Sequence, residues 1–391
     1  MTNVAETEIE LSIVMPCLNE ADTVVECVRK GLEGLKAAGC KGEIILADNG
    51  SMDGSQQLAT KAGARVVDVP QKGYGAALMG GIEAAQGRYV LMGDADDSYD
   101  FREVPRFLEK LRKGAELVQG CRFPSGGGTI RPGAMPWLHQ ILGNPMLTAI
   151  CRLFYRVPVH DIYCGMRGFT KELYQRLGQR CVGMEFATEM IIKARLMGAR
   201  IEEVPITLHP DGRKAHRSHL RTFRDGWRTL RFYLLCSPRW LFLIPGGALI
   251  VLGMVAYGLA LPGATVFGAK LDAHTLVFGS LFILTGFQAV TFALLAKTYA
   301  MADGLLPMDP RVERFYRILP LERGLVLAAM VGVVGVSLLG VAVLHWAQTG
   351  FGPLDYAKNL RLVIPGATLV ALSFQAILFG FFASILGMRK T

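Results

Sequence analysis

The chain has 391 residues, of which 42 are Lys or Arg and 33 are Asp or Glu, and 51% of its residues are hydrophobic. This length allows two domains that each bury a core, and a mean hydropathy of +0.32 is too apolar for an ordinary soluble protein. The composition excludes a disordered chain, a collagen and a small disulfide-rich scaffold. Charged and apolar residues alternate over residues 1–239, whereas long uncharged runs dominate the remainder. We therefore expect a soluble domain followed by a membrane domain.

The start of the chain and the cysteines indicate a compartment. The first ten residues are polar and acidic and lack the basic and apolar regions of a signal peptide, which predicts that the first domain stays in the cytosol. All eight cysteines lie in that domain, without a CxxC pair or a metal-ligand spacing. In a reducing compartment, such scattered cysteines are typical of small buried side chains.

Strands and helices alternate in the first domain. Strand-like runs occupy residues 10–15, 43–47, 65–69, 89–92, 116–119 and 201–207. Helix-length stretches separate the first four, at 20–38, 55–62 and 74–86, with Gly, Asn and Asp at the joins. This alternation predicts an α/β fold with a mostly parallel sheet, helices on both faces and a ligand site at the carboxyl ends of the strands.

Polar turns follow the first four strands. They are Pro16-Cys17-Leu18-Asn19-Glu20, Asp48-Asn49-Gly50-Ser51-Met52-Asp53-Gly54, Gln71-Lys72-Gly73-Tyr74-Gly75-Ala76-Ala77-Leu78 and Asp94-Ala95-Asp96-Asp97-Ser98-Tyr99-Asp100. The second turn carries short polar side chains that suit a base and a ribose. The third lacks the last glycine of a dinucleotide fingerprint and does not follow the first strand, and no Walker lysine motif is present. We therefore exclude hydride transfer.

The fourth turn places four carboxylates within seven residues. A hard divalent cation, Mg²⁺ or Mn²⁺, would relieve their repulsion, with substrate phosphates completing its ligands. Asp94 and Asp96 point to the same side of an extended segment, so both can bind one ion. Asp100 is instead expected to cap the helix near residue 103.

Four apolar runs, at 240–261, 275–296, 324–344 and 362–386, each reach the ~20 residues that cross a bilayer. Eight Lys or Arg residues lie between 213 and 239, one lies between the first two spans, and five lie between 297 and 323. The positive-inside rule then places both termini in the cytoplasm, in a multi-pass cytoplasmic-membrane protein.

An amphipathic helix is predicted just before the first span. An apolar stripe and a cationic face define it: Leu220, Phe223, Trp227, Leu230 and Leu234 against Arg221, Arg224, Arg228 and Arg231. It would lie in the interface among anionic headgroups, or else pack its apolar face on its own domain. The expected domains are a catalytic domain at 1–218, this interfacial helix at 219–239 and the membrane domain at 240–391.

The polar turns and several later segments together resemble the motifs of a known enzyme family. PCLNE, DNGSMDG, QKGYGAA and DAD, in this order on alternating strands, resemble the nucleotide-sugar-binding half of a family 2 glycosyltransferase with the GT-A fold. The segments GCRF at 120–123, DIYCGMR at 161–167, EFATE at 185–189 and EVPI at 203–206 are similar to the dolichol-phosphate mannosyltransferase and polyprenyl-phosphate glucosyltransferase branch. The resemblance covers about residues 10–222 and leaves the four spans unassigned.

The resemblance implies roles for individual residues. The nucleotide sugar and the metal would be held by Pro16, Leu18, Glu20, Asp48, Lys72, Asp94, Ala95 and Asp96. Phosphates would be bound by Arg122 and Arg213, and by Lys214, Arg217 or His219, because His219 stands where the family commonly has a lysine. Asn49 occupies a position where the family often has a second aspartate.

The implied reaction moves a sugar from a nucleoside diphosphate, of the UDP-glucose or GDP-mannose class, to a polyprenyl phosphate with inversion. A metal on Asp94 and Asp96 and a cation such as Arg213 would neutralise the leaving group. A phosphate acceptor is already largely dianionic at neutral pH, so a strong base is optional. Asp161 would orient the acceptor or receive a proton, or else form an ion pair with Arg167.

Two other functions compete with this one. A processive polysaccharide synthase would carry QxxRW before a span, but the glutamine is missing from the stretch Cys236-Ser237-Pro238-Arg239-Trp240. A non-catalytic scaffold for glycan assembly would not need Asp94, Asp96, Arg122 and Arg213. The net charge of +9 collects beside the spans, which favours anionic lipid over nucleic acid. A second copy of the chain and a lipid flippase are further candidate partners.

Overall fold

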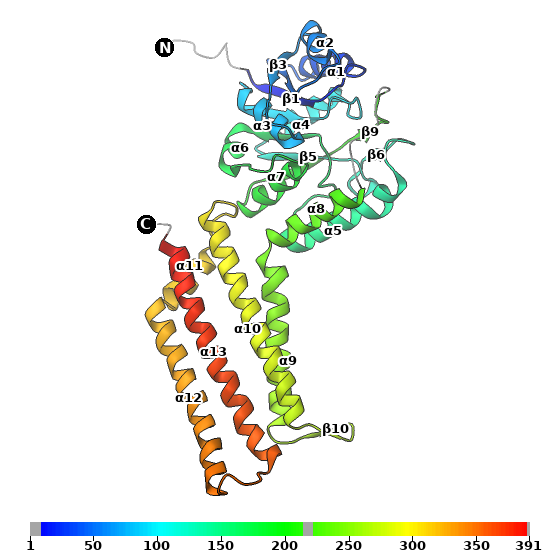
Figure 1. The fold of residues 1–391 in the computed structure, drawn as a ribbon. Coiled ribbons are helices and arrows are strands. Elements are labelled where there is room, and N and C mark those ends of the chain that lie inside the picture. The colour runs from blue at the N-terminus through cyan, green and yellow to red at the C-terminus, as the bar shows by residue number, and fades with distance from the viewer. Residues whose placement is uncertain (1–8, 214–221, 389–391) are drawn as a thin grey trace. The chain divides into compact units, whose positions relative to one another are not determined.

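The computed structural model describes residues 9–213 and 222–388. Within it the chain forms two compact units, Met1–Tyr233 and Leu234–Thr391 (Figure 1). Each unit is described separately below. The finer division at residues 218 and 239 stays a prediction.

A seven-stranded sheet forms the centre of the first unit, in the order β3-β2-β1-β4-β7-β5-β8. Its strands are β1 (Leu11–Cys17), β2 (Gly42–Asp48), β3 (Arg65–Asp68), β4 (Tyr89–Met92), β5 (Leu117–Cys121), β7 (Arg167–Thr170) and β8 (Ile201–Pro205). All neighbours pair in parallel except β7, which is antiparallel to β4 and to β5. The mostly parallel sheet expected from the sequence is therefore confirmed, and all six predicted strands are present.

The antiparallel strand β7 was not predicted. It has only four residues, and one of them is Arg167, whose side chain is fully buried. A buried arginine hides the hydrophobic signal of the strand, so the segment looked like a polar motif instead. The short strands β6 (Thr129–Ile130) and β9 (Thr207–Leu208) pair with each other outside the main sheet.

Helices cover both faces of the sheet, as predicted. Those of the first unit are α1 (Val24–Ala37), α2 (Ser55–Ala62), α3 (Tyr74–Ala84), α4 (Val104–Arg112), α5 (Asn144–Tyr155), α6 (Lys171–Leu177), α7 (Glu185–Leu196) and α8 (Thr222–Leu235). The first three match the predicted helical stretches, and α8 lies within the predicted interfacial helix. Helices α5 to α7 were not predicted.

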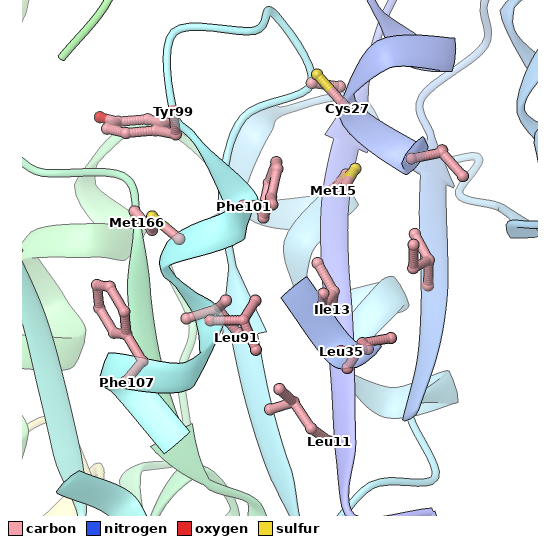
Figure 2. Close-up of a cluster of buried hydrophobic side chains, with 14 of the residues drawn as sticks. Leu11, Ile13, Met15, Cys27, Leu35, Leu91, Tyr99, Phe101, Phe107 and Met166 are labelled. Atoms are coloured by element: carbon pink, nitrogen blue, oxygen red, sulfur yellow. The ribbon is translucent and has the colours of Figure 1, made fainter. Parts of the chain in front are cut away.

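Side chains alternate across β1 and thereby divide the core between the two faces. Leu11, Ile13 and Met15 point toward α1 and meet the buried side chains of α4 and β4 (Figure 2). On the other face, a Cβ at Gly81 of α3 would come within 2.6 Å of Val14. Such close packing fixes α3 against the sheet, and its amino terminus is thereby held beside the carboxyl ends of β2 and β4.

The second unit is helical. Its long helices are α9 (Ile244–Ala260), α10 (Ala273–Ala302), α12 (Leu321–Gln348) and α13 (Tyr356–Met388), and a shorter helix, α11 (Pro310–Ile318), follows α10. Residues Arg239–Ala260, Ala273–Ala302, Leu321–Gln348 and Tyr356–Gly387 are long and apolar enough to cross a membrane. They coincide with the four predicted spans. A two-stranded hairpin of β10 (Thr265–Val266) and β11 (Ala269–Lys270) joins the first two.

Candidate active site

Three of the polar turns meet at one edge of the sheet. Strand β1 lies between β2 and β4 and runs parallel to both, so the turns that follow these strands are neighbours in space. Residue Cys17 at the end of β1 is in register with Asp48 at the end of β2. The structure thus brings the residues around Glu20, Asp48 and Asp94 together at the edge where ligands bind in open α/β sheets.

The first two turns are tied to each other by hydrogen bonds. The backbone N–H of Asn19 donates to Oγ of Ser51 at 2.9 Å, and that of Glu20 donates to Oγ of Ser55 at the same distance. The backbone N–H of Ala21 donates to Asp53. These bonds fix one turn against the other before any ligand binds, which reduces the entropy lost on binding.

Asp48 is fully buried, and one of its carboxylate oxygens finds no partner within residues 9–213 and 222–388. Its Oδ2 accepts hydrogen bonds from the backbone N–H groups of Gly50 and Ser51 and from Nε2 of Gln56, at 2.6–3.0 Å. Burial works to raise the pKa of Asp48, but the hydrogen bonds, with Ser51 first, lower it overall. Its Oδ1 has no hydrogen-bond partner among the described residues. A buried, ionised acceptor of this kind suits an N–H or O–H donor of a ligand.

Asn49 holds the second turn to the third. Its amide nitrogen donates to the carbonyls of Val69 and Gln71, and its Oδ1 accepts from the backbone N–H of Gly73. An aspartate cannot donate to two carbonyls, which explains why an amide occupies this position. Lys72 is exposed and donates from Nζ to the backbone carbonyl of Asn49 at 2.5 Å.

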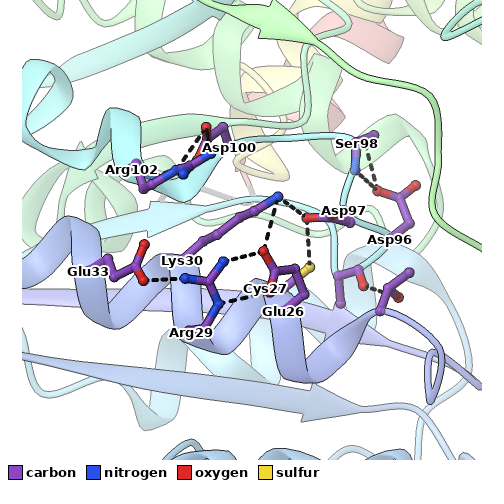
Figure 3. A network of polar contacts seen from close by, with 12 residues as sticks. Glu26, Cys27, Arg29, Lys30, Glu33, Asp96, Asp97, Ser98, Asp100 and Arg102 are labelled. Carbon is purple, nitrogen blue, oxygen red and sulfur yellow. Dashed lines mark hydrogen bonds and ion pairs between the residues drawn. The ribbon is translucent and has the colours of Figure 1, made fainter.

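The acidic turn is neutralised more fully than its sequence indicated. Asp97 pairs with Lys30 at 2.7 Å, and Asp100 pairs with Arg102 (Figure 3). Asp100 also accepts a hydrogen bond from the backbone N–H of Arg102 and so caps the helical turn that begins at Phe101, which confirms its predicted role. Repulsion among all four carboxylates therefore does not by itself require a metal, contrary to the sequence argument.

Arg213 bridges two other predicted site residues. Its Nε donates to both carboxylate oxygens of Glu20, at 2.9 and 3.0 Å, and its Nη2 lies 3.1 Å from Oδ2 of Asp96. Oδ1 of Asp96 accepts from the backbone N–H and the hydroxyl of Ser98. Burial works to lower the pKa of Arg213, but its bond to Glu20 and the charge of Asp96 raise it overall. Arg213 is thus a fixed cation beside the acidic turn.

Asp94 is the one carboxylate of the turn that has no ion pair within the described part of the chain. The hydroxyl of Tyr74 donates to its Oδ1 at 2.9 Å. Burial, followed by the negative charge of Asp96, raises the pKa of Asp94 to about 7. The charged form of Asp94 is therefore unfavourable in these surroundings, and a bound cation would stabilise it.

Asp161 and Arg122 form a buried ion pair. Nε and Nη2 of Arg122 donate to the two carboxylate oxygens of Asp161 at 2.6 and 2.9 Å, and the Asp161 side chain has no exposed surface. The backbone N–H of Tyr163 donates to Asp161 as well. The expected pairing of Asp161 with Arg167 is wrong, because the Arg167 guanidinium donates to the carbonyls of Ile162, Cys164 and Ala187.

The remaining predicted residues show no polar side-chain contact in the described part of the chain; they line the turns or take part through backbone atoms. Pro16 is partly buried, Leu18 is 37% exposed, and the carbonyl of the buried Ala95 accepts from the hydroxyl of Thr23 at 2.7 Å. The predicted phosphate-binding residues Lys214, Arg217 and His219 lie outside the described residues. The prediction missed Tyr74 as the partner of Asp94, although the QKGYGAA motif contains it.

The donor set suits a divalent cation completed by a ligand. In residues 9–213 and 222–388, no group of three or more His, Cys, Asp or Glu side chains is placed to hold a metal ion. Asp94 and Asp96 nevertheless offer carboxylate oxygens two residues apart, and Mg²⁺ in particular is often held by one or two carboxylates together with waters and substrate phosphates. The residues therefore fit such an ion.

Comparisons with known proteins identify the family of the chain. Residues 12–178 match the model of Glycosyl transferase family 2, and residues 294–387 match the Glycosyltransferase family 2 C-terminal transmembrane region. The chain is 37% identical over 348 residues to the low-salt glycan biosynthesis hexosyltransferase Agl6 of Haloferax volcanii, covering 89% of this chain and 82% of the relative.

Two further matches cover a little more than half of the chain. A dolichyl-phosphate hexose transferase of Haloferax volcanii is 29% identical, with 56% of this chain and 89% of the relative covered. A glucosyl-3-phosphoglycerate synthase of Mycobacterium tuberculosis, crystallised with Mn²⁺, UDP and glucosyl-3-phosphoglycerate, is 22% identical, with 58% of this chain and 78% of that chain covered at a TM-score of 0.44.

Proposed function

Because the chain belongs to glycosyltransferase family 2 and ends in a C-terminal transmembrane region of that family, we propose that it transfers a sugar from a nucleoside-diphosphate sugar to a polyprenyl phosphate. The chain is a multi-pass membrane glycosyltransferase with a GT-A catalytic unit. The donor, the acceptor, the metal and the orientation in the membrane are the proposed parts. The name of the dolichyl-phosphate hexose transferase relative supports the acceptor class.

The observation that carries the donor assignment is the row of carboxylates along the ends of β1, β2 and β4. The unpartnered Oδ1 of Asp48 accepts a hydrogen bond from the base or ribose of the nucleotide. The turn that contains Glu20 is hydrogen-bonded to the segment that follows Asp48, and this bond holds the Asp48 turn in position. Asp94 and Asp96, in the turn after β4, bind the diphosphate in this proposal.

A divalent cation, Mg²⁺ or Mn²⁺, is the proposed cofactor. Asp94 and Asp96 hold it, and when bound it supplies positive charge that stabilises the departing nucleoside diphosphate. Arg213 adds a second positive charge to the same place, since it already contacts Asp96. This contact supports a role for Arg213 at the donor diphosphate rather than at the acceptor phosphate.

The acceptor requires little activation. An oxygen of the polyprenyl phosphate attacks the anomeric carbon, the bond from that carbon to the diphosphate breaks, and the nucleoside diphosphate leaves with the bonding electrons. A phosphate monoester has a second pKa near ~6 and needs no strong base at neutral pH. The engagement of both Asp161 oxygens by Arg122 fits this mechanism, and we assign Asp161 a structural role.

The proposed location is the cytoplasmic membrane with the catalytic unit and both termini in the cytoplasm. The basic residues between 213 and 239 and between 297 and 323 support this orientation. Nucleotide sugars are cytosolic metabolites, and this orientation presents the site to them.

The direct test incubates membranes that contain the full chain with a panel of labelled nucleotide sugars and undecaprenyl phosphate, with and without a chelator. We expect one labelled glycolipid that chelation abolishes. Asp96→Ala is expected to lower its formation by at least roughly 100-fold. The matched control is Asp97→Ala, since Asp97 is the next residue but pairs with Lys30 on α1. Full activity in chelator, or in Asp96→Ala, would refute the metal assignment.

Arg213→Ala separates donor from acceptor. The contacts of Arg213 with Glu20 and Asp96 predict that its loss weakens the donor, with a raised KM for the nucleotide sugar and an unchanged KM for the lipid. A change confined to the lipid would return Arg213 to the acceptor phosphate.

A further inference from the structure

The second unit contains a cavity of about 1020 Å³. Residues of α10, α11, α12 and α13 line it, and Figure 1 labels all four helices. The lining includes Leu294 of α10, Leu327 of α12 and Phe379 of α13, which lie in three of the candidate spans. We call it the α10–α13 cavity, and it belongs largely to helices that are apolar enough to cross a membrane.

Three hydroxyl groups of the lining already have hydrogen-bond partners. The hydroxyl of Thr298 donates to a backbone carbonyl of its own helix and is hydrogen-bonded to the hydroxyl of Tyr316, both at 2.8 Å. The hydroxyl of Ser373 donates to the carbonyl of Ala328 at 2.7 Å, and that of Thr291 donates to a carbonyl within α10. Water is held in a buried cavity by polar groups that need partners, and these three do not. Hydrocarbon therefore suits the cavity better than water.

A cavity of this volume calls for a ligand. Voids larger than a water molecule are rare inside proteins, and the free-energy cost of an empty cavity rises with its volume. An apolar ligand that fills the space removes this cost. In a bilayer, acyl chains of lipids are the apolar groups that can enter between membrane-spanning helices.

Helix α11 lies at one end of the α10–α13 cavity. It follows α10 and precedes α12, and the lining residues of α12 lie between Leu321 and Val331, at the start of that helix. Two contacts hold α11 to α10. Lys297 pairs with Asp309, the N-cap of α11, and Thr298 is bonded to Tyr316. The position of α11 at this end of the cavity is thereby fixed.

The end of the cavity at α11 is cationic. Residues 310–323 contain four arginines and two glutamates, and so carry a formal charge of +2. The arginines are Arg311, Arg314, Arg317 and Arg323, and all four are exposed. Arginine binds phosphate through paired N–H donors. Exposed guanidinium groups beside an apolar cavity therefore suit a phosphate that is attached to acyl chains.

Glu313 is the one charged side chain among the described residues that line the cavity. Its carboxylate repels a bare phosphate but accepts hydrogen bonds from hydroxyl groups. Phosphatidylglycerol offers both features, since it has a phosphate for the arginines and two hydroxyl groups that can donate to Glu313. Phosphatidylcholine has a phosphate but no such donor.

We propose that the α10–α13 cavity binds one phospholipid with an anionic, hydroxyl-bearing headgroup of the phosphatidylglycerol type. Its acyl chains fill the space between α10, α12 and α13, and its phosphate lies at the arginines of α11 and of the start of α12. The proposal concerns the second unit alone and is independent of the donor, the acceptor and the metal.

Mass spectrometry of the intact full chain in detergent tests the proposal. The protein is stripped of lipid, and phosphatidylglycerol or phosphatidylcholine is then added back in equal amounts. We expect one phosphatidylglycerol to stay bound per chain, at least roughly 10-fold more tightly than phosphatidylcholine. No retained lipid, or equal binding of the two lipids, would overturn the proposal.

Cavity-filling variants locate the bound lipid. Ala376→Phe and Val331→Phe place a ring in the cavity from α13 and from α12, and each should abolish binding of phosphatidylglycerol. Two variants on different helices keep the test valid if one of them fails to fold. The control Ala329→Phe changes an exposed residue of α12 that is not part of the lining, and it should bind lipid as the wild type does. Wild-type binding in a folded cavity-filling variant would overturn the proposal.

Headgroup recognition is tested with Arg314→Gln/Arg317→Gln, which should remove the preference for phosphatidylglycerol. The matched control is Lys270→Gln/Lys358→Gln, which removes two exposed charges before α10 and in the first turn of α13 and should keep that preference. Loss of preference in the lysine variant alone would contradict the assignment of the arginines.

A competition experiment distinguishes the phospholipid from the proposed acceptor. An equal amount of undecaprenyl phosphate should leave phosphatidylglycerol bound. Displacement of phosphatidylglycerol by undecaprenyl phosphate would assign the cavity to the acceptor lipid and overturn the proposal.

Discussion

The raised pKa of Asp94 makes the stability of the catalytic unit depend on pH in a definite direction. Burial and the charge of Asp96 raise this pKa from 3.8 to about 7 in the folded protein. Between these two values the folded state binds more protons at Asp94 than the unfolded state does. Stability at this site is therefore greatest below about pH 4 and is lost as the pH rises toward 7.

The size of the effect follows from the shift. One pKa unit corresponds to 1.36 kcal/mol, so a shift of about three units amounts to roughly 4 kcal/mol as an upper limit. Replacement of Asp94 by Asn removes the charge and keeps an oxygen that accepts from the Tyr74 hydroxyl. In chelator at pH 8, Asp94→Asn should therefore unfold at a higher temperature, by on the order of 10 °C for a unit of this size.

The assay is thermal unfolding of the full chain in detergent with chelator, from about pH 5 to pH 8. The wild-type midpoint should fall more steeply with rising pH than that of Asp94→Asn, and the control Asp68→Asn, an exposed aspartate, should keep the wild-type slope. Added Mn²⁺ should stabilise the wild type more at pH 8 than at pH 5. Parallel pH profiles for wild type and Asp94→Asn would show that Asp94 is not the strained carboxylate.

Three further substitutions test the packing of the site, each by thermal unfolding of the full chain. Asp161→Asn leaves the buried Arg122 cation unpaired and should cost about 3–5 kcal/mol; a loss below 1 kcal/mol would contradict a buried pair. Gly75→Ala would place a Cβ 2.3 Å from a backbone carbonyl and should cost about 1–3 kcal/mol, whereas Gly226→Ala in α8 meets nothing within 4 Å and should be neutral or stabilising. Asn49→Asp loses two donated hydrogen bonds and should lower both stability and nucleotide affinity, the latter measured by calorimetry; unchanged affinity would separate this turn from the donor site.

Local sequence patterns predicted strands and membrane spans, but they did not predict contacts between residues far apart in the chain. The predicted strands and spans are present because uninterrupted apolar runs of the right length have few alternatives. The partner of Asp161 was sought six residues away, at Arg167, but it is Arg122, 39 residues away and directly after β5. Only the order of the strands, with β7 inserted between β4 and β5, brings that arginine to it.

Helix α5 escaped prediction for a different reason. The helix before the first span was recognised because an apolar stripe alternates with a stripe of arginines, and α5 has no such contrast in charge, since Arg152 is its one charged residue. Helix α8 has that contrast and was found. A helix with one charged residue is hard to recognise from its charge pattern, but in the structure Leu147 and Cys151 are buried whereas Met146 and Leu153 are exposed.

The glycines of the QKGYGAA motif allow the start of α3 to pack closely on a neighbouring loop. This packing in turn positions a side chain that contacts the acidic turn. A Cβ at Gly73 or Gly75 would lie within 2.3 Å of a backbone carbonyl in the 181–182 loop, so the amino end of α3 rests directly on that loop. Glu189 holds the loop by accepting its backbone N–H groups and is paired in turn with the buried Lys193. Between these two glycines stands Tyr74, whose hydroxyl reaches Asp94. The packing of this motif therefore fixes Tyr74, and through its hydroxyl it keeps the Asp94 carboxylate in place despite the repulsion from Asp96. The positive charge of an ion bound there would offset that repulsion.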